Sequence, residues 1–205
     1  MKKLLALFLY ICILQSCAAP EKMPREYQKE ARIIGALGAA DVNGGKSWSP
    51  RIGGQVGVET KIHKLKNNSS VGAGLGVSFQ GASYEEDMYS GKVNMTYLNI
   101  PLLYTYESNV GIYGEAGLQP GILLSAKDKF YGGSYNYRDY MKTFDLGLPI
   151  GAGYNINENL SIGARVTFGL LNIDNSGSDV KDHNFLITGL VRYKLHLPSK
   201  KTEDK

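Results

Sequence analysis

One stretch, Met95 to Tyr106, alternates between two sets of side chains and constrains the fold more than any other part of the chain. Apolar and aromatic residues occupy every second position from Leu98 onward, and a mixed set occupies the positions between them. Because successive side chains of an extended chain point to opposite faces of a sheet, this pattern predicts a β-strand. A strand that crosses a bilayer needs about 9–11 residues, and this stretch has that length. Tyrosines stand at both ends, where such a strand would meet the lipid headgroups.

The same length and alternation recur along the chain and predict eight strands. We expect them at about residues 32–40, 51–65, 71–84, 95–106, 110–125, 143–154, 160–172 and 183–195. Polar segments such as Glu85 to Val93 and Ala126 to Lys142 are predicted to be loops. The connections alternate between long and short, as they do in outer-membrane barrels, where the turns are periplasmic and the longer loops extracellular. With both termini in the periplasm, all the long connections would lie outside the cell.

Eight antiparallel strands can close into a barrel without leaving an unpaired edge, as a bilayer requires. The predicted fold class is therefore all-β, an eight-stranded antiparallel up-and-down transmembrane β-barrel over residues 32–195, in a bacterial outer membrane. A soluble lipocalin-like barrel, with its apolar face inward, is the alternative. The opposing face is mostly Gly, Ser, Thr and Gln, which suits a narrow interior better than an aqueous coat. Pro101, Pro120 and Pro149 each remove a ladder donor, so we expect bulges there.

The first seventeen residues have the pattern of an export signal. Lys2 and Lys3 precede an apolar run from Leu4 to Leu14 that is too short to span a membrane. Leu14-Gln15-Ser16-Cys17 resembles the lipobox of bacterial lipoproteins, in which the cysteine is lipidated. Ordinary cleavage after Ala18 is the alternative.

Two further segments flank the predicted barrel. Residues 18–31 are predicted to form a periplasmic tether, and residues 196–205 a charged tail. Both cysteines, Cys12 and Cys17, lie in the signal, so the mature barrel can hold no internal disulfide.

Composition and motif content argue against several classes of function. A formal net charge of +4 without a basic cluster interleaved with aromatics does not indicate a nucleic-acid partner. The chain's three histidines, His63, His183 and His196, are not spaced as metal ligands, and no nucleophile elbow is present. We therefore expect no cofactor, no metal and no catalytic activity. An outer-membrane enzyme acting on lipid or peptide remains the alternative.

Six charged residues fall on the predicted inward face. They are Glu59, Lys61, Glu115, Asp145, Arg165 and Arg192. Such charges could line a conducting path, or they could pair and plug the lumen, and an unpaired buried charge would be very costly. We predict a plug, in which Arg165 pairs with Glu115 or with Asp145.

The predicted loop between residues 126 and 142 is rich in tyrosine. Its tyrosines are Tyr131, Tyr135, Tyr137 and Tyr140. Tyrosine offers a large contact area with a polar tip, so these residues are candidates for recognising a protein or glycan partner. Alternatively, some of them belong to the aromatic girdle at the membrane surface.

The motif from Tyr97 to Leu103, YLNIPLL, resembles the signature of the PorT-like outer-membrane β-barrel domain family. The segments from Phe144 to Tyr154 and from Leu160 to Ile173 are similar to that family's sixth and seventh strands, and the resemblance covers about residues 31–195. It implies an eight-stranded barrel in a Gram-negative outer membrane. Most members have no assigned activity, and the namesake implies a component of a protein-secretion machine. Family barrels usually end on an aromatic-terminated strand, whereas a tail follows here.

The sequence thus predicts a non-enzymatic outer-membrane barrel with a plugged lumen and a structural or binding role through its extracellular loops. A component of a secretion machine, a small pore and an outer-membrane enzyme are the alternatives.

The substitution Cys17→Ala distinguishes the two processing routes. If Cys17 is lipidated, metabolic labelling with a fatty-acid analogue will be lost in the variant. Barrel assembly will be unchanged, because eight strands already hold the protein in the membrane. Absence of label from the unaltered protein, together with a mature N-terminus at Ala19, would instead establish ordinary cleavage.

Overall fold

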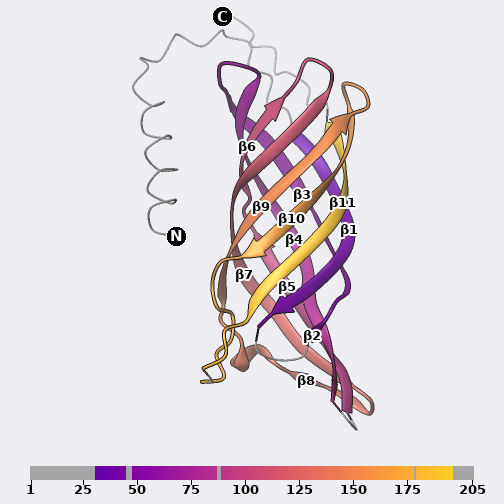
Figure 1. Ribbon diagram of the computed structural model, residues 1–205, viewed down its shortest axis with the longest axis vertical. Coiled ribbons are helices and arrows are strands. Elements are labelled where there is room, and N and C mark those ends of the chain that lie inside the picture. Colours follow the sequence, from indigo (N-terminus) through magenta and orange to yellow (C-terminus); the bar gives the residue numbers. More distant parts are fainter. Residues whose placement is uncertain (1–30, 45–47, 87–88, 178, 196–205) are drawn as a thin grey trace, which may run out of the picture.

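The sheet closes on itself because the first and last strands of the chain pair with each other, Ala31 opposite Leu195 and Asn43 opposite His183 (Figure 1). The computed structural model describes residues 31–44, 48–86, 89–177 and 179–195. Its strands are β1 (Ala31–Asn43), β2 (Trp48–Ser49), β3 (Arg51–Lys64), β4 (Ser69–Glu86), β5 (Tyr89–Asn99), β6 (Leu102–Glu107), β7 (Ile112–Phe130), β8 (Gly133–Asn136), β9 (Phe144–Asn155), β10 (Leu160–Gly169) and β11 (His183–Leu195), with a short 3₁₀ helix η1 (Arg138–Tyr140).

These eleven strands build a barrel of eight. The strands β5 and β6 keep one register against β4, because Gly76 lies opposite Asn99 and Ala73 opposite Leu102. They are therefore one barrel strand with a gap at its centre. The short strands β2 and β8 pair only with the ends of β4 and β7. All pairings are antiparallel, so the predicted eight-stranded antiparallel barrel is confirmed.

Two segments that the sequence analysis assigned to loops are strands. The segment from Glu85 to Val93 is mostly occupied by the ends of β4 and β5. The segment from Ala126 to Lys142 contains the last residues of β7, all of β8 and η1. These residues are polar because they extend beyond the apolar belt, where a strand can face water on its outer side. Their polarity marked the edge of the membrane and not the end of the strand.

The prolines interrupt the ladders without shifting them. Within the described residues the register shifts at Lys61/His63 and at Thr96/Tyr97, so the expectation of bulges at the prolines was wrong. Pro101 lies in the gap between β5 and β6, where the Ile100 amide donates to the Pro120 carbonyl at 2.9 Å. A missing N–H removes one hydrogen bond, whereas a bulge requires an extra residue.

The outer face of the barrel is apolar and ends in aromatic residues. Tyr104, Tyr106, Tyr154 and Tyr193 face outward near the end with short turns, whereas Phe79, Phe144 and Phe168 face outward near the end with long connections. From Phe144 to Tyr154, ten residue steps of about 3.4 Å at a tilt of about 45° give a height of about 24 Å. That height matches the apolar band of outer-membrane barrels, about 25 Å.

We call the end with connections 65–68, 108–111 and 156–159 the turn end, and the other the loop end. The turn end lies uppermost in Figure 1, and β8 marks the loop end. The turn between β3 and β4 is tight because Asn67 and Asn68 both adopt φ of 58°, a conformation that asparagine tolerates better than most residues. The predicted signal with Cys17, the predicted tail and residues 18–30 of the predicted tether lie outside the described residues. Ala31, the last residue assigned to the tether, is instead the first residue of β1. Among the described residues, no helix has the length and hydrophobicity needed to cross a membrane.

Replacement of Ile150 by arginine tests the lipid-facing assignment. Ile150 is 47% exposed on β9, between Phe144 and Tyr154, so we expect Ile150→Arg to destabilise the protein by about 2–4 kcal/mol. Ile156 is equally exposed at 48% but lies in the turn after β9, so Ile156→Arg is the matched control and should cost about 0–1 kcal/mol. Urea unfolding in lipid vesicles, followed by heat-modifiable migration, measures both. Equal costs would contradict the assignment.

Candidate functional site

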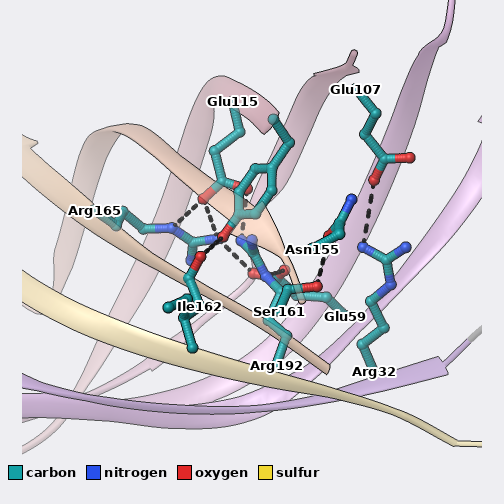
Figure 2. Close-up of polar contacts among 10 residues, drawn as sticks. Arg32, Glu59, Glu107, Glu115, Asn155, Ser161, Ile162, Arg165 and Arg192 are labelled. Carbon is teal, nitrogen blue, oxygen red and sulfur yellow. Dashed lines mark hydrogen bonds and ion pairs between the residues drawn. The ribbon is translucent and has the colours of Figure 1, made fainter. Parts of the chain in front are cut away.

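Four charged side chains meet inside the barrel and form a closed ring of ion pairs, which we call the quartet (Figure 2). Its members are Glu59 on β3, Glu115 on β7, Arg165 on β10 and Arg192 on β11. Arg165 donates to Glu115 through Nε at 2.9 Å and to Glu59 through Nη2 at 2.9 Å. Arg192 donates to Glu59 through Nε at 3.2 Å and to Glu115 through Nη2. Each guanidinium thus bridges both carboxylates.

The quartet is deeply buried and electrically neutral. The side chains of Glu115, Arg165 and Arg192 are 2–4% exposed, and that of Glu59 is 12% exposed. Burial of one such charge without a partner would cost several kcal/mol, and pairing with hydrogen bonds offsets this penalty. Two carboxylates and two guanidiniums leave no net charge. The ring therefore joins strands from opposite walls of the barrel across its interior.

Glycines on β9 and β10 make the space in which the quartet lies. The guanidinium of Arg192 stacks over the ring of Tyr113 at 5.1 Å from its centroid. A Cβ at Gly153 or at Gly163 would approach the Tyr113 hydroxyl to 2.4 Å. The glycine-rich inner face noted in the sequence thus has a specific role here, since it admits a bulky ring and an arginine side by side.

Two of the six predicted lumen charges lie outside the quartet. Lys61 donates to Glu107 at 2.7 Å, closer to the turn end, and Arg32 lies 3.7 Å from the same carboxylate. Asp145 lies toward the loop end and accepts a hydrogen bond from Asn184 at 2.8 Å. Of the two partners predicted for Arg165, the structure places Glu115 in contact with it, whereas Asp145 has no ion pair among the described residues.

The space beside the quartet on the side of the turn end is small. It is a cavity of about 30 Å³ lined by polar and charged groups, including Glu59, Lys61 and Arg192. This is enough for one or two water molecules and too little for a larger ligand.

A second, apolar layer fills the lumen at the loop end. We call it the apolar cap: Val42, Ala82, Val93, Met95, Tyr97, Leu123, Ala126, Met141 and Ile173, with Trp48, Tyr84 and Tyr137 packed against it. Met141 and Ile173 come from the connections and not from the barrel wall. The loops therefore fold back into the mouth of the barrel. The lumen is filled by charges near its middle and by apolar side chains at the loop end.

The four loop tyrosines have different environments. Tyr131 is fully exposed at the tip of the β7–β8 hairpin, and Tyr135 is 53% exposed. Tyr137 packs on the apolar cap. The ring of Tyr140 stacks on the ring of Tyr137, with the centroids 5.2 Å apart. Hydrogen bonding with Tyr140 raises the pKa of Tyr135 above its ordinary value. Only Tyr131 and Tyr135 therefore present most of their rings to a partner, whereas Tyr137 anchors the loop.

Sequence reasoning missed several residues that shape the lumen. Glu107 shares the inward phase of Leu103 and Thr105, so the alternation of the stretch could have identified it. Arg32 precedes a run of small apolar residues on both faces, which hid its phase. The contributions of Met141 and Ile173 left no periodic signal, because they belong to irregular connections.

The YLNIPLL motif places every second residue, beginning with Tyr97, inside the barrel. Tyr97 is fully buried beside Met95, with its hydroxyl 3.8 Å from the methionine sulfur. Asn99 donates to the Ser78 hydroxyl at 2.7 Å, and Pro101 lies in the gap between β5 and β6. The motif thus spans the boundary between the apolar cap and the polar middle of the lumen.

The described part of the chain was also compared with the requirements of a metal site. No group of three or more His, Cys, Asp or Glu residues is arranged there to hold a metal ion. The buried carboxylates of the quartet are already bound to arginines.

Comparison with known proteins gives a family and a fold. The model of the family described as "Outer membrane protein beta-barrel domain" matches residues 35–175. No curated protein resembles the chain closely enough in sequence to count as a match.

Solved structures similar to this one are bacterial outer-membrane barrels. Neisserial surface protein A superposes with a TM-score of 0.58 at 13% identity, over 80% of this chain and 99% of that one. The attachment invasion locus protein Ail of Yersinia pestis gives 0.47 at 18% identity, over 82% and 98% of the two chains. The outer membrane enzyme PagL gives 0.41 at 15% identity, over 79% and 98%. At such identities the likeness concerns the fold alone.

The quartet predicts that losing one charge costs more than losing two. Glu115→Gln leaves a buried guanidinium without a full partner, and we expect a loss of about 3–5 kcal/mol. Glu115→Gln combined with Arg165→Gln restores neutrality and should cost less than the single change. Urea unfolding followed by the fluorescence of Trp48, the chain's one tryptophan, measures both. The exposed Lys64→Gln is the control, and additive costs would contradict the ring.

Proposed function

Because the chain belongs to the outer membrane protein β-barrel domain family, and so lies in a bacterial outer membrane, we propose that it is a closed, non-conducting scaffold that presents its loop end for binding. It carries out no chemistry of its own in this proposal. The observation that carries the proposal is the pairing of a filled lumen with strands that extend beyond the membrane belt.

The filled lumen supports the non-conducting part of the proposal. An eight-stranded barrel is only wide enough for its own side chains, and here the quartet and the apolar cap occupy it at two heights. An ion entering from either end would have to displace both a neutral ring of charges and a packed apolar layer. Each of these layers is sufficient to stop conduction.

The loop end supports the binding part of the proposal. The β7–β8 hairpin is a rigid extension of the barrel wall, and Arg138 fixes η1 to it by donating to the Leu124 carbonyl at 2.7 Å. This arrangement holds Tyr131 and Tyr135 outward on an ordered support. Rigid aromatic side chains lose little entropy on binding, so a protein or glycan surface is the partner that they fit.

The YLNIPLL motif supports a narrower placement within the family, beside the PorT-like barrels. The burial of Tyr97, Asn99 and Pro101 gives this motif a structural role in the lumen. The secretion role that this resemblance implies remains the alternative function.

Single-channel recording in planar bilayers tests the closed barrel. We expect the wild-type protein to insert and remain electrically silent. We also expect the neutral variant Glu115→Gln with Arg165→Gln to stay silent, because the apolar cap still blocks the loop end. A steady conductance from the wild type would overturn the proposal and make the protein a small pore.

Alanine substitution of the exposed tyrosines tests the binding role. Aromatic residues at the centre of interfaces commonly contribute about 2 kcal/mol or more, so Tyr131→Ala with Tyr135→Ala should weaken binding by tenfold or more. The readout is binding of the protein in lipid vesicles to an oligosaccharide array, together with crosslinking from a photoreactive residue at position 131 on intact cells. Tyr104→Ala, on the lipid face, is the matched control. Equal binding by wild type and the double variant would exclude these tyrosines as the recognition site.

A further inference from the structure

Three lysines gather on the outer wall of the barrel just beyond its apolar belt. Lys92 on β5 lies directly opposite Lys129 on β7. Two positions along, in the next pair on the same face of the sheet, Lys127 lies opposite Asn94. All three lysines are exposed. We call these four residues the lysine patch.

The lysines of the patch point outward, because the residues that alternate with them along β5 and β7 are buried. Val93 is 3% exposed, Met95 1% and Ala126 1%. Asp128, between the two β7 lysines, accepts hydrogen bonds from the Tyr84 hydroxyl at 3.0 and 3.1 Å, and Tyr84 packs against the apolar cap. Since these residues face the interior, the lysines face away from it, toward the surrounding membrane.

The patch lies at the height of lipid headgroups. Thr96 follows Asn94 by two residues and lies closer to the membrane centre. It is opposite Phe79, one of the outward-facing phenylalanines near the loop end. Two strand residues at a tilt of about 45° raise Asn94 about 5 Å above that level, and four raise Lys92 about 10 Å. The headgroup layer is about 5–8 Å thick on each side of the hydrocarbon, and lysine side chains can bend toward it.

Among the described residues, the patch carries a net positive charge. Like charges directly opposite each other destabilise a sheet, and no ion pair joins any of the three lysines to another described residue. One acidic residue of the described parts of β4, β5, β7 and β8, Glu85, shares this face, opposite Ser90 and further from the membrane. Three positive charges and one negative charge leave a net charge of +2.

Hydrogen-bond donors extend the patch on both sides. The register places Ser83 opposite Lys92, Ser134 opposite Lys129 and Asn136 opposite Lys127. The Asn94 amide donates to the backbone carbonyls of Lys92 and Lys127, at 3.4 and 3.5 Å, and joins the two strands. Directly below, Ile122 and Leu124 are exposed on β7 and provide an apolar surface for an acyl chain.

We propose that the lysine patch binds the phosphate of an outer-leaflet lipid, whose acyl chains lie on the apolar belt beneath it. Ammonium groups and hydroxyls recognise the phosphate, and the sideways direction of the patch selects a membrane lipid over a soluble anion. Binding removes the repulsion between Lys92 and Lys129. The orientation rests on the long connections being extracellular.

Native mass spectrometry of the full-length protein in detergent, with added lipid A as the probe, tests this proposal. We expect the wild type to retain one lipid A molecule and Lys92→Gln with Lys127→Gln and Lys129→Gln to bind it at least tenfold more weakly. The control variant Lys64→Gln with Lys66→Gln and Lys181→Gln removes the same charge elsewhere and should bind as the wild type does. Replacing the three patch lysines by arginine should preserve binding.

Two further arms identify the source of the anion. Lipid A without its phosphates should bind no better to the wild type than to the patch variant, and inorganic phosphate and heparin oligosaccharides should not compete. Retention of lipid A by the patch variant would overturn the proposal. Equal binding of the dephosphorylated lipid would also overturn it, as would tight binding of either soluble anion.

A single charge reversal separates binding from stability. Lys129→Glu places opposite charges across the β5–β7 pair, so without lipid it should raise the urea midpoint of unfolding, while it weakens lipid A binding. A purely structural role for Lys129 would move both measurements in the same direction, which would contradict the proposal.

Discussion

The whole structure depends on one constraint, that backbone amides and carbonyls inside a bilayer have no water to bind. Pairing of β1 with β11 meets it by closing the sheet. Closure with eight strands fixes a narrow lumen, and that lumen decides what the inward face can carry. Small residues such as Gly153 and Gly163 are needed wherever a large side chain crosses the interior. These two glycines therefore provide space in a narrow lumen.

Charge inside such a lumen must balance over a short distance. Glu59, Glu115, Arg165 and Arg192 balance as a ring at one height. At another height, Lys61 and Arg32 both form ion pairs with Glu107. Asp145 instead shares a hydrogen bond with Asn184 near the apolar cap. Replacement of such a ring by apolar residues is often neutral for stability. Its cross-wall geometry, in contrast, links four strands to one another, which fits the proposed closed scaffold.

Alternation predicted the strands and the facing of most residues, because period two survives in any sheet. Alternation could not predict the height of each residue along the barrel axis. That height determines which charges pair in the lumen and which strand ends lie in water. The inward phase of Lys61 and Asp145 was visible, but their partners depend on the register of neighbouring strands. The polar ends of β4, β5 and β7 have the composition of loops because water, not lipid, surrounds them. Met141 and Ile173 enter the lumen from irregular segments, where no periodicity exists.

The tyrosines show how phase and height together assign a role to one residue type. Tyr97 faces inward near the loop end and is fully buried. Tyr104 faces outward near the turn end, at the membrane surface. Tyr131 lies beyond the belt and is fully exposed. Phase and height likewise distinguish two lysines. Lys61 faces inward and has a carboxylate partner inside the barrel, whereas Lys92 faces the membrane surface. Lys92 and Lys129 lie at the height of the lipid headgroups and face outward, which is why a membrane lipid is the partner proposed for them.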